Sequence, residues 1–131
     1  YLVMIKEMAK EHHPVKHVKR FKYAFNGIFH ALINEANFRI QVLYTIVVIY
    51  AGIYFSISHT DWALIVLSLG FLLSAEMVNT AVENVIDHVT HHYDESARII
   101  KDLSAGFVLV TAICTLLVGI IVFSPYITLY F

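Results

Sequence analysis

Charged side chains are missing from long stretches of this 131-residue chain, and this spacing is its strongest pattern. No Asp, Glu, Lys or Arg occurs from Ile40 to Thr60, from Trp62 to Ala75 or after Asp102. A helix needs about 20 apolar residues to cross the hydrocarbon core of a bilayer. The first and third stretches reach that length, and the second reaches it only by carrying Glu76 and Glu83 into the membrane. The pattern predicts three membrane-spanning helices, over residues 40–58, 62–86 and 103–124.

The segment before the first predicted span has the 3.6-residue period of an amphipathic helix. One side of it is apolar and carries Val18, Phe21, Phe25, Ile28, Phe29 and Leu32. The opposite side is polar and largely basic, with Lys16, Lys19, Arg20, Asn26, His30 and Asn34. We expect a surface helix over residues 15–35, behind a loose start at 1–14, that lies in the membrane interface. A simple anchor for anionic lipids explains this helix as well as a catalytic role does.

Composition and charge agree with an all-α membrane protein that forms one domain, residues 1–131. The chain is 59% hydrophobic and 15% charged, which leaves too little charge to coat a water-soluble fold. With three spans, all nine Lys and Arg residues fall on one side of the membrane. The positive-inside rule makes that side cytoplasmic, together with the N-terminus. A formal net charge of −1 argues against a nucleic-acid partner.

Polar side chains inside the second predicted span are the first candidates for chemistry, because charge in hydrocarbon is costly. The helical repeat places Glu76, Asn79, Thr80, Glu83 and Asp87 on one face. Glu76 and Glu83 lie about 10.5 Å apart along the helix axis, which is too far for both to bind one ion. Their oxygen atoms are the ligands that Mg²⁺ prefers, together with phosphate and water oxygens.

Two further positions have more than one interpretation. Glu35 follows the surface helix, and it either supplies the second carboxylate for a metal at Glu83 or pairs with Arg39 four residues later. The spacing leaves both alternatives open. Lys101 and Asp102 open the third predicted span, where a capping and snorkelling pair is the ordinary interpretation.

A group of histidines follows the acidic face, at His88, His91 and His92. Together with Asp87 they contain enough ligands for a zinc ion. A solvated turn on the cytoplasmic side is the favoured interpretation.

Two classes of function fit a polar, metal-binding face at the cytoplasmic end of a helical bundle. One is phosphoryl transfer to a membrane alcohol, in which Mg²⁺ and basic side chains hold the phosphates. The other is an ion or proton path through an oligomer. Acids that cluster at one end, beside basic groups, favour phosphoryl transfer, because a pore favours acids spread through the depth of the membrane.

These residues resemble the prokaryotic diacylglycerol kinase family, which includes the undecaprenol kinases of Gram-positive bacteria. The resemblance runs from about Lys16 to Phe123. Its most specific part is Ala75-Glu76-Met77-Val78-Asn79-Thr80-Ala81-Val82-Glu83 with Asp87. The segment 34–39 is similar to the interfacial motif of that family, and the segment 101–106 is similar to its element before the last span.

The resemblance implies a small lipid kinase that uses ATP and Mg²⁺. Glu76 would be the general base that orients the lipid hydroxyl, and Glu35 and Glu83 would hold the metal. Nucleotide contacts would come from Lys16, Tyr23, Asn79, Asp87, Lys101 and Asp102. Lipid contacts would come from Phe25, Asn26, Phe38 and Arg39. The resemblance also implies homotrimers in the bacterial cytoplasmic membrane, with sites composed between protomers.

Four positions depart from the family pattern. Asp94 stands where many members carry His, and Ile100 replaces a small residue, so both concern nucleotide contacts. Phe25 and Asn26 stand where the diacylglycerol-specific enzymes tend to have Trp and Lys, which brings this segment closer to the undecaprenol kinases. We expect phosphorylation of undecaprenol, with diacylglycerol as the second choice of acceptor. From a different class, the alternative is an inactive relative or a small bundle that conducts ions or protons.

Overall fold

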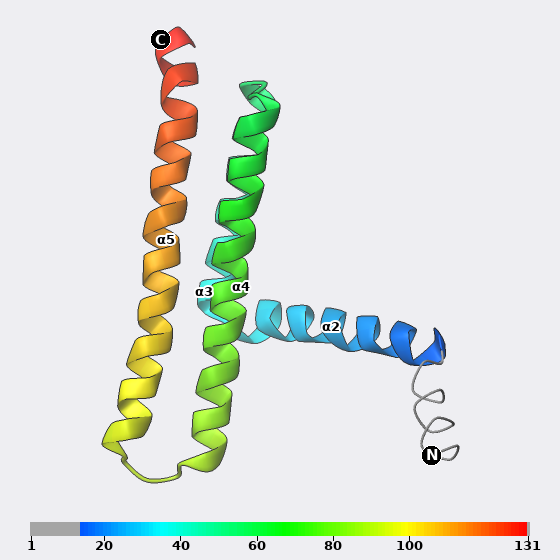
Figure 1. Ribbon diagram of the computed structural model, residues 1–131, viewed down its shortest axis with the longest axis vertical. Coiled ribbons are helices and arrows are strands. Elements are labelled where there is room, and N and C mark those ends of the chain that lie inside the picture. The colour runs from blue at the N-terminus through cyan, green and yellow to red at the C-terminus, as the bar shows by residue number, and fades with distance from the viewer. Residues whose placement is uncertain (1–13, 131) are drawn as a thin grey trace, which may run out of the picture.

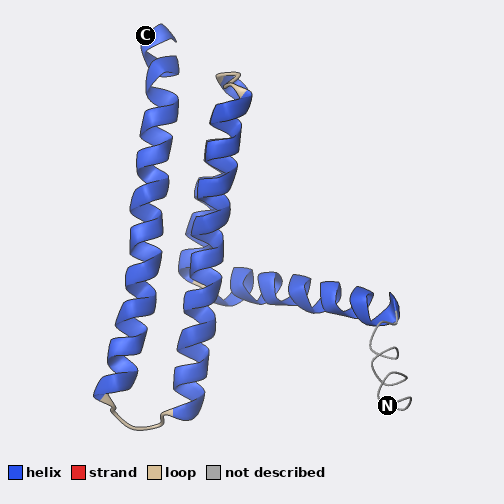
Figure 2. Ribbon diagram, viewed as in Figure 1, coloured by secondary structure: helices blue, strands red, loops and turns tan. Residues whose placement is uncertain are grey.

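The computed structural model describes residues 14–130, and it describes side chains from Lys19 to Leu129. The helices in this range are α2 (Pro14–Asn34), α3 (Ala36–Tyr54), α4 (His59–Val89) and α5 (Glu95–Tyr130). Figure 2 shows short links and no strand in this part of the chain. The predicted all-α fold class is confirmed.

Three of the helices form a bundle, and the fourth projects from it. α3, α4 and α5 run side by side, while α2 leaves the base of α3 at a steep angle (Figure 1). α4 packs against both α3 and α5. Of the most apolar part of α4, 39% is buried, against 17% for α3 and for α5. α4 is therefore the central helix, and it carries the acidic face that the sequence singles out.

Three helices are long and apolar enough to cross a membrane: Ala36–Tyr54, His59–Val89 and Glu95–Leu129. α4 and α5 have 31 and 36 residues, which is about 46 and 54 Å of helix at 1.5 Å per residue. A hydrocarbon core is only about 30 Å thick. Both helices therefore continue past the predicted spans at their linked ends, which extend below the level of α2 in Figure 1. Hydropathy marks only the membrane part of such a helix, because the backbone hydrogen bonds carry on into water.

The outer faces of the bundle are apolar. On α3, Leu43 and Ile46 are 63% and 58% exposed, and on α5, Leu109 and Ile121 are 62% and 69% exposed. Side chains of this kind are stable against lipid tails and costly in water. The surface of the bundle therefore fits a membrane environment.

A tight turn joins α3 to α4 at the end of the bundle that lies away from α2. Ser58 caps α4, because its Oγ accepts from the Asp61 N–H at 3.1 Å and donates to Asp61 Oδ2 at 2.7 Å. Tyr126 of α5 donates to the same carboxylate oxygen at 2.7 Å and accepts from the Ser58 N–H at 3.0 Å. Gly52 lets the two helices approach, since an added Cβ would lie 2.7 Å from the Trp62 ring. This end is held by specific polar and packing contacts.

The apolar stripe of α2 is left uncovered by the rest of the described chain along most of its length. Phe21, Phe25 and Phe29 are 69%, 69% and 63% exposed, and burial begins at Ala31. The Arg39 guanidinium donates to the carbonyl of Ile33 at 2.6 Å, which caps the end of α2 and holds the corner with α3. An exposed apolar stripe opposite basic residues suits the membrane interface.

Candidate functional site

Glu76 is the most deeply buried charged side chain among the described residues, with 2% of its surface exposed. It lies on α4 and faces α3, where Gln41 Nε2 donates to Glu76 Oε2 at 2.9 Å. Asn37 and the carboxylates of Glu35 and Glu83 lie in the neighbourhood of Glu76. Burying a carboxylate among like charges is unfavourable, so this position is a functional candidate.

A chain of hydrogen bonds links α5 to the acidic face of α4 one turn beyond Glu76. The Ser104 hydroxyl donates to Asn79 Oδ1 at 2.6 Å, and Asn79 Nδ2 donates to Glu83 Oε1 at 3.0 Å. Asn79 is 8% exposed, and Glu83 is half-buried. The three side chains therefore have fixed orientations. Glu83 keeps its second carboxylate oxygen for another ligand.

Charged side chains gather on the linked ends of α4 and α5. Lys101 Nζ contacts Asp87 Oδ1 at 2.5 Å across the two helices. Arg98 contacts Asp102 at 2.8 Å and Glu95 at 2.5 Å along α5. The lysine and two of the acids are predicted nucleotide contacts, and the structure brings them to one end of the bundle.

A cavity of about 220 Å³ opens between these ends and the link that joins them. It is lined by residues of both helices and of the link, among them Asp87, His92, Tyr93, Asp94, Arg98 and Lys101. The hydrogen bond that Tyr93 donates to Glu95 raises the pKa of the Tyr93 hydroxyl above its ordinary value. Tyr93 therefore keeps its proton, and its role as a hydrogen-bond donor, to a higher pH than an ordinary tyrosine.

The two departures in this region have structural explanations. Asp94 Oδ1 accepts from the Ala97 N–H at 2.9 Å, so Asp94 caps the start of α5. Ile100 lines an apolar groove together with Val78 and Val82 of α4. Asp94 thus caps the helix terminus, and Ile100 lines a groove between the two helices.

The predicted metal ligands do not form a complete metal site in the described chain. Glu35 occupies the N-cap position of α3 and its side chain makes no capping hydrogen bond. Among the described residues, no three His, Cys, Asp or Glu side chains converge to hold an ion, which leaves the zinc alternative at His88, His91 and His92 unsupported. Mg²⁺ needs only one or two protein carboxylates, because phosphates and water supply its other ligands. The two glutamates fit that requirement by their chemistry.

The ion pair considered for Glu35 is not the contact that Arg39 makes. Arg39 Nη1 donates to the backbone carbonyls of Ile33, at 2.6 Å, and Leu32, at 3.4 Å. No Glu35–Arg39 ion pair occurs among the described side chains. The carboxylate of Glu35 is therefore not neutralised by Arg39.

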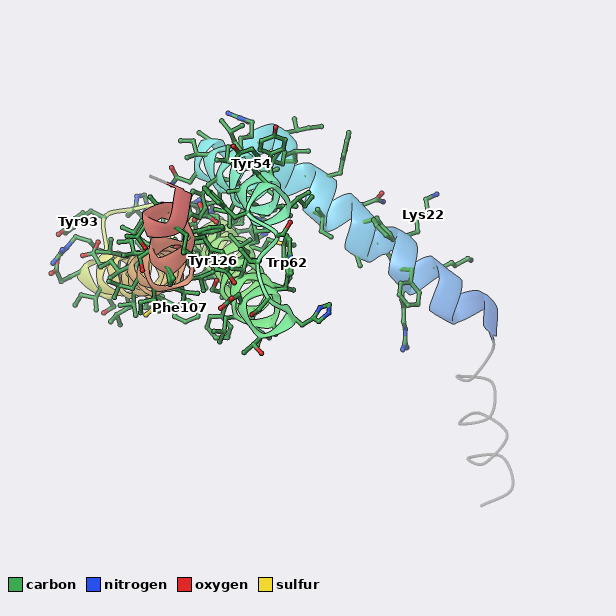
Figure 3. All side chains as sticks on the ribbon, turned by 90° about the horizontal axis from the view of Figure 1, so that it is seen from above. Lys22, Tyr54, Trp62, Tyr93, Phe107 and Tyr126 are labelled. Atoms are coloured by element: carbon green, nitrogen blue, oxygen red, sulfur yellow. The ribbon has the colours of Figure 1, made fainter. Side chains whose placement is uncertain are left out.

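The structure separates the predicted contacts on α2 from the site on α4. The part of α2 that contains Tyr23, Phe25 and Asn26 points away from the bundle, as the position of Lys22 shows in Figure 3. The side chain of Lys16 lies outside those that the structure describes. Phe38 is 3% exposed and so packs inside the bundle, which does not leave it open to a lipid. A single copy of the chain does not bring these residues together.

Two side chains at the site escaped the sequence analysis. Gln41 lies 35 positions from Glu76 and is an ordinary polar residue near a predicted span boundary. Ser104 lies inside the motif at 101–106, and that motif was the only signal that pointed to it. Both act across helix interfaces, which no sequence period marks.

Comparisons with known proteins point in one direction. Residues 22–123 match the sequence model of the family described as prokaryotic diacylglycerol kinase. An undecaprenol kinase of Bacillus subtilis is 32% identical over 107 residues, which are 82% of this chain and 87% of that protein. A diacylglycerol kinase of Synechocystis is 36% identical over 100 residues, which are 76% of this chain and 57% of that protein. A diacylglycerol kinase of Escherichia coli K12 is 26% identical over 96 residues, covering 73% of this chain and 79% of that protein.

Proposed function

We propose that this chain, which belongs to the prokaryotic diacylglycerol kinase family, is a lipid kinase that transfers the γ-phosphoryl group of ATP to undecaprenol. The observation that carries the proposal is the buried carboxylate of Glu76, one turn from the Asn79–Glu83 pair and next to a charged end of the bundle. Glu76 lies between the apolar part of the bundle and its charged end. A membrane lipid would approach it from the first side and a nucleotide in water from the second.

Glu76 is the proposed general base. It accepts the hydroxyl proton while the hydroxyl oxygen bonds to the γ-phosphorus, and the bond from that phosphorus to the β–γ bridging oxygen breaks. The electron pair of the broken bond leaves with ADP. Its burial at 2% exposure keeps water away from the reacting oxygen.

Glu35 and Glu83 are the proposed ligands for Mg²⁺, which, when bound, neutralises charge on the ATP phosphates. Glu83 is oriented for this role by Asn79, which is itself held by Ser104. Both glutamates offer the hard oxygen ligands that Mg²⁺ prefers.

The linked ends of α4 and α5 are the proposed nucleotide site. Lys101 is half-buried and pairs with Asp87. A phosphate group of ATP is also negatively charged, and it can replace Asp87 as a stronger hydrogen-bonding partner of Lys101. Asn79, Asp87 and Asp102 complete this site. Lys16 and Tyr23 belong to the same proposal through α2.

The proposed acceptor is undecaprenol, and diacylglycerol is the alternative. Phe25 is 69% exposed on the apolar side of α2, where it can contact a lipid, and Asn26 follows it. These two positions, with Arg39 at the corner, are the proposed lipid contacts of the surface helix. The Bacillus subtilis relative is named for the same acceptor.

We also propose a homotrimer in the bacterial cytoplasmic membrane, with the N-terminus on the cytoplasmic side. Two features support it. The contacts proposed for α2 lie apart from the α4 site in one chain (Figure 3), and the apolar outer faces of α3 and α5 leave room for neighbouring copies. A second copy can supply α2 to the site of the first.

The test is transfer of labelled γ-phosphate from ATP in mixed micelles that offer undecaprenol and diacylglycerol side by side. Glu76→Gln should lower the rate by at least about 100-fold and leave Mg²⁺-ATP binding intact. The matched control is Asp61→Asn, which removes a carboxylate charge at the opposite end of the bundle and should keep the rate. Label in diacylglycerol alone would replace undecaprenol as the acceptor. Label in neither lipid would favour the inactive relative or the ion-conducting bundle.

A further inference from the structure

Gln41 has a hydrogen-bonding arrangement that the proposed roles do not explain. Its Nε2 donates to Glu76 Oε2 at 2.9 Å. Its Oε1 is buried and has no hydrogen-bond partner, and it is the only side-chain oxygen or nitrogen in this condition among the described residues. Buried polar atoms in native proteins nearly always have partners, so an exception calls for an explanation.

The orientation of the Gln41 amide follows from the charge of Glu76. An ionised carboxylate only accepts hydrogen bonds, so the amide must turn its N–H groups toward Glu76. This leaves the amide oxygen on the other side. The local helix supports the residue, because Thr45 Oγ1 donates to the Gln41 carbonyl at 2.8 Å.

Water does not supply the missing hydrogen-bond partner of Gln41 Oε1. Gln41 lines a groove of about 240 Å³ between α3, α4 and α5, and the other lining residues are Ile40, Tyr44, Leu72, Ala112 and Leu116. A groove with apolar walls of this kind gives a water molecule too few partners to be held. The amide therefore stands at the boundary between an apolar groove and the buried carboxylate.

We propose that Gln41 is a positioning residue that serves Glu76 in both of its protonation states, an inference that rests on the proposed role of Glu76 as the base. Before transfer, the N–H of Gln41 orients the carboxylate and leaves the other oxygen of Glu76 for the acceptor hydroxyl. After transfer, Glu76 holds the proton that the hydroxyl has lost.

The unpaired oxygen is the partner for that second state. Rotation of the Gln41 amide and of the Glu76 carboxyl group by half a turn, each about its last side-chain torsion, brings Gln41 Oε1 to the newly protonated oxygen of Glu76, which donates its O–H to it. These torsions are soft in glutamine and glutamate. The phosphate group of the departing product then takes up the proton, and the starting arrangement is restored. A group that both donates and accepts is the only neutral kind that fits both states.

The experiment compares Gln41→Met with the unchanged chain in the mixed-micelle assay. Methionine keeps the length and volume of the side chain and removes both hydrogen-bonding atoms. We expect kcat to fall by about 10- to 100-fold, with KM for ATP and for the lipid within about twofold. Gln41→Glu, which keeps the shape and loses the N–H donors, should also lose kcat. The matched control is Tyr50→Phe, which removes a hydroxyl group from an exposed residue of α3.

Three outcomes would overturn the proposal. They are a wild-type kcat in Gln41→Met, a loss that appears only in KM, and a joint loss of ATP binding and of thermal stability in both Gln41 variants. The last outcome would assign Gln41 to the integrity of the bundle. Glu76→Gln is measured alongside, because activity retained in that variant would refute the proposed base itself. An inactive Glu76→Gln beside a fully active Gln41→Met would refute only the role of Gln41.

Discussion

Ser104 of α5 holds the side chain of Asn79 on α4, with Ser104 Oγ 2.6 Å from Asn79 Oδ1. Because this oxygen is engaged, the amide must present its nitrogen to Glu83, where Nδ2 donates at 3.0 Å. The orientation of the proposed metal ligand on α4 is thus set from α5. A shift of α5 relative to α4 would therefore change the orientation of the Glu83 carboxylate.

Replacing Ser104 by alanine should therefore weaken the use of Mg²⁺. The Asn79 amide loses its fixed orientation, and we expect the Mg²⁺ concentration for half-maximal activity to rise by about tenfold. A Mg²⁺ titration of phosphoryl transfer at saturating ATP measures this. Ser124→Ala is the control, since the Ser124 hydroxyl donates to the carbonyl of Ile121 in its own helix. Superimposable titrations of Ser104→Ala and the unchanged chain would contradict the expectation.

Glu35→Gln should shift the Mg²⁺ titration in the same direction. The change removes the charge of one of the two proposed metal ligands and keeps the shape of the side chain, so about tenfold more Mg²⁺ should be needed. Arg39 remains on the carbonyl of Ile33 and does not depend on this carboxylate. An unchanged Mg²⁺ titration, with lower thermal stability, would limit Glu35 to a role in the corner between α2 and α3.

Tyr126→Phe should lower stability and spare activity. The variant loses the hydrogen bond to Asp61 and leaves the Ser58 N–H without its acceptor, a cost of about 1 to 3 kcal/mol. These contacts of Tyr126 lie at the opposite end of the bundle from the charged ends of α4 and α5, so kcat should not change. Thermal unfolding in detergent tests this, with Tyr50→Phe as control because Tyr50 is 70% exposed. A stability equal to that of the control would show that the hydrogen bonds of Tyr126 contribute nothing to the stability of the bundle.

Gly52→Ala should destabilise the same end of the bundle by packing. The new methyl group would lie 2.7 and 2.9 Å from two atoms of the Trp62 ring, and overpacking of this kind costs about 1 to 3 kcal/mol. Gly70→Ala is the matched control on α4, where a Cβ meets nothing within 4 Å. Unfolding midpoints of the two variants in one detergent give the comparison. Equal midpoints would mean that Trp62 moves aside without cost.

Much of the fold was readable from local patterns. The absence of charge marked three spans, and the 3.6-residue period placed Glu76, Asn79 and Glu83 on one face of α4. These are properties of a single helix, because a helix fixes the angle between its own side chains whatever surrounds it. Motif resemblance then predicted the family, which the match over residues 22–123 confirms.

Side-chain contacts between helices could not be predicted from the sequence in the same way. Gln41 meets Glu76, and Ser104 meets Asn79, only because α3, α4 and α5 pack at particular rotations and heights. The function of Asp94 as a helix cap also depends on where α5 begins. A sequence period gives the face of a helix but not the register of its neighbour.

The sequence by itself determined the membrane class, the number of spanning helices, the amphipathic surface helix and the acidic face. Each follows from hydropathy or from the geometry of one helix. Only the tertiary structure decided that Glu76 is buried against Gln41, that Ser104 orients the Asn79–Glu83 pair, and that α2 points away from the site. The physical reason is that these contacts join residues far apart in the chain, and their formation depends on how whole helices pack against one another.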